Sequence, residues 1–480
     1  MTARSLTQRL KDAAVFSYPE ASRLLQTPRE FPSDPSTIRS FSIDTRNLAA
    51  GDLFVALKGE HSDGHQFLKT AFEKGASGAL IDARQKVSVL ADADKGGWKV
   101  RNLLAVSDPQ QAMTALAADY RRSLSVKIVG ITGSVGKTTT KEFLYYLLRQ
   151  QFAVLATSGN LNNHLGVPMM LSRLEPAHKF CVLEMGASHP GEIRYLAGLA
   201  GPAGGILTPI GPAHLEGFGT LENVYRTKLE LAEGLEKNGP LVVSADDPHL
   251  LELIGQRKMH PVCVGASEQA EYRISEVSAE KGTVNFTLNG RWKFSFPGQA
   301  SFLALNAGLA IAMARSLGMP WEALPQKWQD VGFASGRFRE TILPNGVRVI
   351  DDSYNANPVS FENALKAFHS LPRTGKKIIV FADMLEMGAE EDRFHRELGE
   401  KMARTDADLA LAFGKRTRAS IEAVLNAKTG CVAKHFDDAA ALELFLKDIL
   451  KPGDAVLFKG SRGMHVEKVL AGVTAMTFKG

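Results

Sequence analysis

A glycine-rich segment between a short apolar run and a helical pattern constrains this chain more than any other feature. Residues 126–131 (VKIVGI) are typical of a buried strand, and a helical pattern begins at Glu142. The connecting residues, 130–140, have the sequence GITGSVGKTTT. Glycines let backbone N–H groups approach a phosphate, and the start of a helix adds positive potential. The segment therefore predicts a phosphate-binding loop, with Lys137 placed for the terminal phosphates and Thr138 for Mg²⁺.

Length, charge and cysteine content narrow the class of protein. The 480 residues, 44% hydrophobic and 23% charged, suit two to four globular domains. The net charge of +5 suits small anionic ligands and does not indicate a nucleic-acid partner. Three scattered cysteines form neither a disulfide framework nor a zinc site, which favours a reducing cytoplasm. The first twenty residues do not resemble a secretion signal, and the longest apolar stretch, 307–314, is too short to span a bilayer, so we predict no membrane partner.

From about residue 126 onward, short apolar runs alternate with helical patterns, which predicts parallel βαβ units. The predicted strands are 126–131, 180–185, 204–210, 240–245, 347–351, 377–382, 409–413 and 455–459. A stretch rich in Pro and Gly, 318–338, separates two clusters of these strands. Residues 270–297 predict a β-hairpin that turns at Asn289-Gly290.

The fold class predicted from this pattern is α/β with three domains. Residues 1–108, where the alternation is weak, form a small N-terminal α/β domain. Residues 109–319 form a central doubly wound domain with the phosphate loop, and residues 320–480 form a Rossmann-like C-terminal domain.

Three residues of the central segment stand where nucleotide chemistry needs them. Glu184 ends a predicted strand and could be a metal ligand, although such an acid can equally be a solvated edge residue. His214 follows another strand and could bind a second metal, although a lone loop histidine is often without function. Lys228 lies on the apolar stripe of a helix. Its head group could reach solvent from a buried stem, or its neutral amine could react with CO₂ to give a metal-binding carbamate.

Polar residues in the last third follow a predicted strand as well. The segment 351–358 (DDSYNANP) comes at the carboxyl end of a strand, where α/β proteins present polar groups to ligands. Arg337, just upstream, could contact a γ-phosphate near the domain junction. Taken alone, both features are as consistent with turn chemistry as with a site.

Together these segments resemble the Mur ligase family. The resemblance also rests on 157–168 (TSGNLNNHLGVP), 183–188 (LEMGAS), 213–219 (AHLEGFG), 382–388 (ADMLEMG) and 459–469 (KGSRGMHVEKV), which occur in the family's order. An early segment, 42–67, resembles the part of these enzymes that holds a sugar nucleotide. The motifs are most similar to those of members that add D-alanyl-D-alanine to a UDP-N-acetylmuramoyl-tripeptide.

The resemblance implies an ATP-dependent, ADP-forming amide ligase with ATP and two Mg²⁺ as cofactors. The residues implied for ATP are Gly133, Ser134, Val135, Gly136, Lys137, Thr138, Thr139, Asn306, Arg337 and Asp352. Those implied for metal are Thr138, Glu184, His214 and, if carbamylated, Lys228, while Lys137, Lys228, Arg337 and His214 are implied in catalysis. Relatives usually carry a histidine shortly before the residue that Asn306 matches, and this chain has none there.

The resemblance also implies where the substrates bind. The UDP group would contact Asp44, Thr45 and Arg46. The peptide substrates would contact Asn160, Asn162, Asn163, Ser188, Asn355, Asn357 and Arg462. We expect a cytoplasmic monomer that takes part in peptidoglycan precursor synthesis. Two alternatives stay open: a sister ligase that adds a single amino acid, including a folylpolyglutamate-synthase-like enzyme, and a phosphate-loop switch protein that controls a partner.

Overall fold

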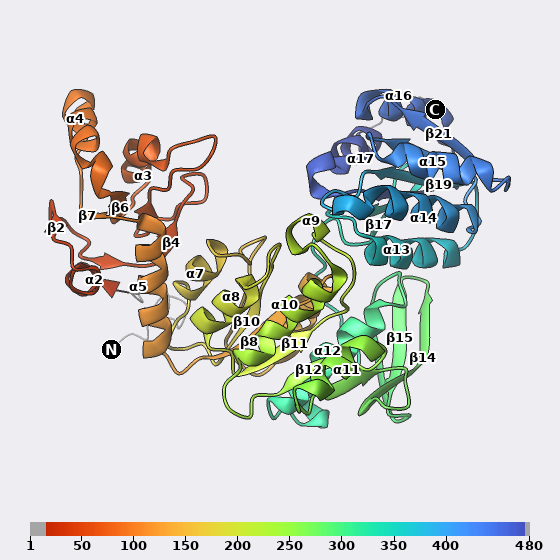
Figure 1. The fold of residues 1–480 in the computed structure, drawn as a ribbon, viewed down its shortest axis with the longest axis horizontal. Coiled ribbons are helices and arrows are strands. Elements are labelled where there is room, and N and C mark those ends of the chain that lie inside the picture. The colour runs from red at the N-terminus through yellow and green to blue at the C-terminus, as the bar shows by residue number, and fades with distance from the viewer. Residues whose placement is uncertain (1–15, 476–480) are drawn as a thin grey trace.

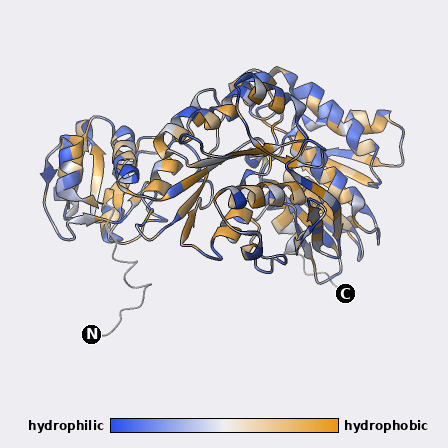
Figure 2. Cartoon of the chain, turned by 90° about the horizontal axis from the view of Figure 1, so that it is seen from below, coloured by the Kyte–Doolittle hydropathy of each residue, from blue (hydrophilic) through white to orange (hydrophobic). Residues whose placement is uncertain are grey.

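The computed structural model describes residues 16–475 and contains three main β-sheets flanked by helices. Figure 1 shows the sheets as three successive bodies, with the N-terminal one at the far end of the molecule from the C-terminal one. Strands drawn as apolar lie inside, between helices whose colouring alternates between apolar and polar (Figure 2). The three-part α/β architecture that the sequence predicts is confirmed. Residues 1–15, on which much of the prediction about a secretion signal rests, lie outside the described part.

The N-terminal sheet has five strands in the order β2-β7-β6-β5-β4, all parallel except β2. Its strands are β2 (Arg29–Glu30), β4 (Phe41–Ser42), β5 (Leu53–Val55), β6 (Gly78–Asp82) and β7 (Leu103–Val106), and a separate pair is formed by β1 (Phe16–Ser17) and β3 (Thr37–Ile38). The helices are α2 (Tyr18–Leu25), α3 (Leu68–Glu73), α4 (Lys86–Gly96) and α5 (Pro109–Ser123). Asp108 caps α5 by accepting from the backbone N–H groups of Gln110 and Gln111, and Pro109 opens the first turn.

The central sheet has nine strands in the order β16-β15-β14-β13-β12-β11-β8-β10-β9. The strands are β8 (Lys127–Thr132), β9 (Val154–Ala156), β10 (Phe180–Glu184), β11 (Gly204–Leu207), β12 (Leu241–Ser244), β13 (Val262–Gly265), β14 (Tyr272–Glu280), β15 (Thr283–Leu288) and β16 (Trp292–Pro297). Strand β8 lies where the chain order reverses, and such switch points bind ligands in parallel sheets. Its phosphate loop therefore leaves the sheet at a favourable place for a ligand.

Helices cover the central sheet, and its last three strands are antiparallel. The helices are α6 (Lys137–Leu148), α7 (Gly166–Leu171), α8 (Glu192–Ala200), α9 (Leu215–Phe218), α10 (Leu221–Glu233), α11 (Pro248–Gln256) and α12 (Leu303–Ser316). The predicted hairpin is β15–β16, where Asn289 and Gly290 both have positive φ, as a tight turn requires. The hairpin extends the central sheet through β14, a strand that the sequence did not indicate. Helix α12 is buried as predicted, and no helix among the described residues is long and apolar enough to cross a membrane.

The C-terminal sheet has six strands in the order β17-β18-β22-β19-β20-β21, all parallel except β17. The strands are β17 (Arg339–Ile342), β18 (Arg348–Asp352), β19 (Lys377–Ala382), β20 (Leu409–Phe413), β21 (Val432–Phe436) and β22 (Ala455–Lys459). The helices are α13 (Pro358–Ser370), α14 (Glu391–Ala403), α15 (Thr417–Asn426), α16 (Ala439–Ile449) and α17 (Val466–Thr474). All eight strands predicted from the sequence are present, and the strands it missed here are the two at the sheet edges, β17 and β21.

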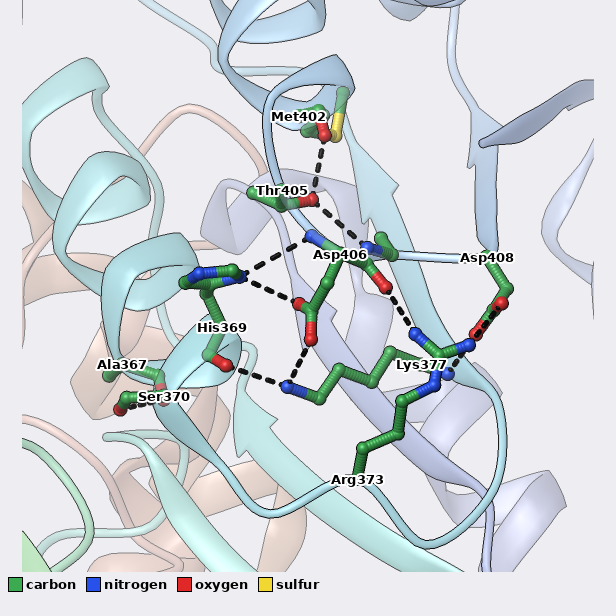
Figure 3. Close-up of polar contacts among 10 residues, drawn as sticks. Ala367, His369, Ser370, Arg373, Lys377, Met402, Thr405, Asp406 and Asp408 are labelled. Atoms are coloured by element: carbon green, nitrogen blue, oxygen red, sulfur yellow. Dashed lines mark hydrogen bonds and ion pairs between the residues drawn. The ribbon is translucent and has the colours of Figure 1, made fainter. Parts of the chain in front are cut away.

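A charged network stabilises the end of the C-terminal sheet where β19 begins (Figure 3). Lys377 has a side chain only 1% exposed, and its Nζ donates to the Asp406 carboxylate at 2.8 Å and to the His369 carbonyl at 2.7 Å. His369 Nδ1 lies 2.8 Å from the other Asp406 oxygen, and Arg373 pairs with Asp408. The network joins the end of α13, the start of β19 and the turn after α14. Because Lys377 is buried and Asp406 is about a third exposed, removing Asp406 should lower the free energy of unfolding more than removing Lys377 does.

We predict that Asp406→Ala is more destabilising than Lys377→Met. The first change leaves a buried ammonium with only a carbonyl partner and should lower the free energy of unfolding by about 2–3 kcal/mol. The second removes the buried charge and leaves Asp406 in contact with solvent, so the loss should be smaller. Urea unfolding checks this, with Asp437→Ala, whose side chain is 98% exposed, as the control. Equal losses for both variants would contradict the asymmetry.

Candidate active site

The phosphate loop connects β8 to α6 through glycines that no other residue could replace. Gly133 and Gly136 have φ values of 144° and 88°. A Cβ at Gly133 would lie 2.1 Å from the Thr208 hydroxyl oxygen, and one at Gly136 would lie 2.6 Å from Asn306 Oδ1. Asn306, predicted for the nucleotide, therefore packs directly against the loop. Here the Lys137 Nζ donates to the Gly133 carbonyl at 2.8 Å.

Thr138 and Glu184 meet at the start of α6. The Thr138 hydroxyl donates to Glu184 Oε2 at 2.9 Å, and Asn162 Nδ2 donates to Oε1 at 2.9 Å. The backbone N–H of Glu184 donates to the Thr157 hydroxyl, which fixes the end of β10. A hydroxyl and a carboxylate in contact fit Mg²⁺, which takes few protein ligands and fills its shell with phosphate and water oxygens. Among residues 16–475, no three His, Cys, Asp or Glu side chains form a group that could hold a metal ion.

Lys228 is buried within α10, with 3% of the residue exposed. Its Nζ donates to the Ala187 carbonyl at 3.3 Å and lies 5.1 Å from the centre of the Phe218 ring. Burial, reinforced by the nearby Lys137 charge, lowers the pKa of Lys228 to about 7. The head group therefore does not reach solvent, and a substantial fraction of the amine is neutral near pH 7.

His214 begins α9 with a left-handed backbone, φ 53°. Its Nδ1 is in direct contact with a carboxylate oxygen of Glu386, which comes from the loop after β19. Burial lowers the pKa of His214, although Glu386 opposes this shift. The imidazole therefore tends to be neutral, as a metal ligand must be.

The C-terminal part contributes Arg337 and Asp352 to the same region. Arg337 Nη2 donates to the Thr138 hydroxyl at 3.2 Å, and its guanidinium carbon lies 4.1 Å from the centre of the Tyr354 ring. Asp352 accepts from Lys459 Nζ at 2.5 Å and ends β18. Burial raises the pKa of Asp352 and the Lys459 charge opposes that shift. The carboxyl edges of the central and C-terminal sheets thus face each other.

One cavity of about 850 Å³ lies between these two edges. The predicted residues that line it are Gly133, Ser134, Val135, Gly136, Lys137, Thr139, Asn162, Asn163, Glu184, Ser188, His214, Lys228, Asn306, Arg337, Asp352, Asn355 and Asn357. Thr138 does not line it but binds Glu184 and Arg337, which do. The structure therefore brings together most of the residues predicted for nucleotide and metal.

A smaller cavity of about 140 Å³ adjoins the first and shares with it Ala213, His214, Asn355 and Asn357. The loops after β18, β19 and β22 form its other walls, and Arg462 lies in that lining. Five predicted residues line neither cavity: Asp44, Thr45, Arg46, Asn160 and Thr138. The first three lie in the loop after β4 of the N-terminal sheet, where Asp44 accepts from Arg46 and the Thr45 carbonyl accepts from Lys74.

Lys459, Tyr354 and Glu386 are among the residues around the cavities that were not predicted as site residues. Lys459 is the last residue of β22, and its buried ammonium holds Asp352. Tyr354 stacks on Arg337 and Glu386 contacts His214. All three follow or end a strand, and that position could have marked them as candidate site residues. Their contacts could not be predicted, because their partners come from distant parts of the chain.

Comparison with known proteins supports the three-part arrangement. Three family models match successive segments: "Mur ligase family, catalytic domain" over residues 37–121, "Mur ligase middle domain" over 131–314 and "Mur ligase, glutamate ligase domain" over 336–462. Among solved structures, MurF from Acinetobacter baumannii is 28% identical with a TM-score of 0.80, covering 96% of this chain and 99% of its own. MurF from Thermotoga maritima in complex with ADP is 30% identical with a TM-score of 0.74, covering 91% and 97%.

A curated relative extends the similarity over nearly the whole chain. The UDP-N-acetylmuramoyl-tripeptide–D-alanyl-D-alanine ligase of Bacillus subtilis is 32% identical over 439 residues, which are 91% of this chain and 93% of the relative. With all three family models matched in order and the phosphate loop, Glu184 and Arg337 assembled around one cavity, this chain belongs to the Mur ligase family.

Proposed function

We propose that this chain is an ATP-dependent ligase that joins D-alanyl-D-alanine to the tripeptide of UDP-N-acetylmuramoyl-tripeptide and releases ADP and phosphate. The observation that carries the proposal is the cavity where the phosphate loop, the Thr138–Glu184 pair and Arg337 meet. The relative from Bacillus subtilis carries this activity in its name, and the Thermotoga maritima MurF was solved with ADP.

ATP binds with its phosphates at the loop 133–139. Lys137 and Arg337 approach the terminal phosphates, Asn306 contacts the adenine and Asp352 contacts the ribose. Asn306 packs against Gly136 of the loop and lines the larger cavity, which supports a role in nucleotide binding. Mg²⁺, held by Thr138, Glu184 and His214, would neutralise phosphate charge.

The chemistry proceeds in two steps. The terminal carboxylate of the tripeptide attacks the γ-phosphorus of ATP, and the bond from that phosphorus to the β-phosphate oxygen breaks. ADP departs, and the tripeptide carries an acyl phosphate. The neutral amine of the dipeptide then attacks the acyl carbon, and inorganic phosphate departs as the amide forms and the amine loses a proton. Lys137 and Arg337 act by position and charge, since phosphoryl transfer needs mainly in-line placement and charge stabilisation.

The smaller cavity suits the incoming dipeptide. It opens into the larger cavity beside His214 and has Arg462 at a wall that the larger cavity does not share. The dipeptide amine must face the acyl phosphate, so its carboxylate points the other way, toward a guanidinium that can bind it. Small apolar residues, Ala213 and Ala356, suit methyl side chains. The tripeptide then lies along Asn160, Asn162, Asn163 and Ser188, with Asn355 and Asn357 between the two substrates.

The remaining parts of the proposal concern the whole chain. Residues 1–108 bind the UDP group through Asp44, Thr45 and Arg46, residues 109–319 bind ATP, and residues 320–480 bind the dipeptide. The protein acts in the cytoplasm, where its nucleotide substrates are made, and as a monomer. A sister ligase for a single amino acid is disfavoured because the Bacillus subtilis relative, which is 32% identical over 91% of this chain, is named a D-alanyl-D-alanine ligase. The alternative function, a phosphate-loop switch protein, does not explain why a second cavity adjoins the larger one.

A Lys137→Ala variant tests the central proposal. We expect ADP release by the wild type to require both UDP-N-acetylmuramoyl-tripeptide and D-alanyl-D-alanine. Release should fall about 100- to 1000-fold or more in the variant, because a partly buried cation is lost beside the phosphates. Lys127→Ala, an exposed lysine at the other end of β8, is the matched control and should be unaffected. Nucleotide turnover with neither substrate present would favour the switch instead.

An Arg462→Ala variant tests the dipeptide site. Loss of a charged hydrogen bond should raise the KM for D-alanyl-D-alanine about 10- to 100-fold and change kcat less. The wild type should discriminate against the dipeptide amide, which lacks the carboxylate, and the variant should not. Lys468→Ala, exposed on α17, is the control. Discrimination that survives in Arg462→Ala would place the carboxylate elsewhere.

Lys228 is proposed to carry a carbamate, since burial and Lys137 lower its pKa to about 7. The neutral amine attacks CO₂, a C–N bond forms and one proton is released. Because the neutral fraction grows as pH rises through about 7, the ¹³C NMR signal from ¹³C-bicarbonate should increase between pH 6 and pH 8 and be absent in Lys228→Ala. Ligase activity of that variant should be low and partly restored by acetate. Full activity without acetate would count against the carbamate.

A further inference from the structure

The partner of His214 comes from the other side of the cavity. His214 precedes α9 of the central part, and Glu386 lies between β19 and the 3₁₀ turn Gly388–Glu390 of the C-terminal part. Figure 1 shows α9 on the side of the central body that faces the C-terminal one. Besides the contact between His214 Nδ1 and the Glu386 carboxylate, the Glu216 N–H donates to the Glu386 carbonyl at 3.1 Å. Two independent contacts thus join the same two loops.

The loop that presents Glu386 is firmly held. The buried Asp383 carboxylate accepts from the N–H groups of Arg416 and Thr417, each at 2.9 Å. His395 Nε2 accepts from the Met384 N–H at 3.0 Å, and the Ser461 hydroxyl accepts from the Leu385 N–H at 2.9 Å. These bonds fix the backbone immediately before Glu386, whose own side chain is about half exposed. The carboxylate is therefore placed by the loop rather than by burial.

A carboxylate at Nδ1 determines which nitrogen of a neutral imidazole carries the proton. The N–H lies on Nδ1, where it donates to Glu386, and Nε2 keeps its lone pair. A histidine that ligates a metal through one ring nitrogen usually donates the N–H of its other ring nitrogen to a carboxylate or a carbonyl in this way.

We propose that Glu386 is a positioning residue that sets the tautomer and orientation of His214, so that a divalent cation binds well at His214 only when the C-terminal loop 383–388 is docked on α9. The inference rests on the proposed function, in which His214 is a cation ligand. It differs from that function by giving the C-terminal part a role in cation binding before any dipeptide enters.

Mn²⁺ binding to the full-length protein tests the inference, with electron paramagnetic resonance as the readout and a non-hydrolysable ATP analogue present. We expect Glu386→Ala to raise the Mn²⁺ dissociation constant of one site about 10- to 100-fold. Glu386→Gln keeps an oxygen that can accept from Nδ1 and should have a smaller effect. Glu390→Ala, which removes a carboxylate of the adjoining turn that pairs only locally with Arg393, should leave binding unchanged.

The tautomer provides a second readout that does not depend on activity. In protein labelled with ¹⁵N-histidine, the His214 ring, assigned with His214→Gln, should show the proton on Nδ1 in the wild type and a shift toward Nε2 in Glu386→Ala. Thermal unfolding should confirm that the variant is folded. Either an unchanged Mn²⁺ affinity or an unchanged tautomer in Glu386→Ala overturns the inference.

Failure of the inference and failure of the proposed function give different results. If His214→Ala weakens Mn²⁺ binding and Glu386→Ala does not, only the role of Glu386 is wrong. If His214→Ala leaves Mn²⁺ binding unchanged, His214 is not a cation ligand and the inference falls with that part of the function. The ligation assay with the wild type tests the reaction itself and depends on neither variant.

Discussion

Desolvated positive charge around one cavity is the constraint on which the site depends. Lys228 is buried there and Lys137 is partly buried, and desolvation lowers the pKa of each. A neighbouring positive group lowers each pKa further, Arg337 at Lys137 and Lys137 at Lys228, while Glu184 opposes the shift at Lys137. Buried cations in mutual repulsion are costly for a folded chain. Negative charge in the cavity, from a bound polyanion or a modified side chain, offsets this cost. ATP, a nucleotide-linked peptide and a lysine carbamate each supply such charge.

That arrangement requires two sheets with their carboxyl edges opposed. The central sheet supplies the phosphate loop and Glu184 at the ends of β8 and β10, and the C-terminal sheet supplies Asp352 and Lys459 at the ends of β18 and β22. Arg337 crosses between them to the Thr138 hydroxyl. Each sheet alone would hold only half of the charge pattern, so the chemistry depends on how the two bodies are docked.

Sequence reasoning succeeded where a residue type and a strand end coincide. The phosphate loop, Glu184 and Asp352 all follow buried apolar runs, and parallel sheets present such positions to ligands. Strand β21, which the sequence did not predict, has an alternating exposed pattern and no apolar run of that kind. Strand β9 lies in an apolar run, 152–156 (FAVLA), but is only three residues long and partly buried. Lys228 shows what the sequence could not predict. Its place on the apolar stripe of a helix was evident, but the surroundings of its head group were not. Phe218 and Ala187 surround that head group, and only the tertiary structure brings them near.

The N-terminal sheet sets a geometric requirement on any sugar-nucleotide substrate. It is attached to the central part by buried hydrogen bonds, from the Phe41 N–H to the Ser172 hydroxyl at 3.1 Å and from the Tyr120 hydroxyl to the Leu174 carbonyl at 2.7 Å. The side chains of Asp44 and Arg46 instead form an ion pair with each other, with Arg46 87% exposed, so a ligand can displace that pair at little cost. If UDP binds there, the attached peptide must extend from a firmly docked sheet to the cavity. The adjustment that brings the reacting groups together then falls on the C-terminal body, whose polar contacts at Thr138 and His214 are the ones that can be exchanged for contacts to substrate.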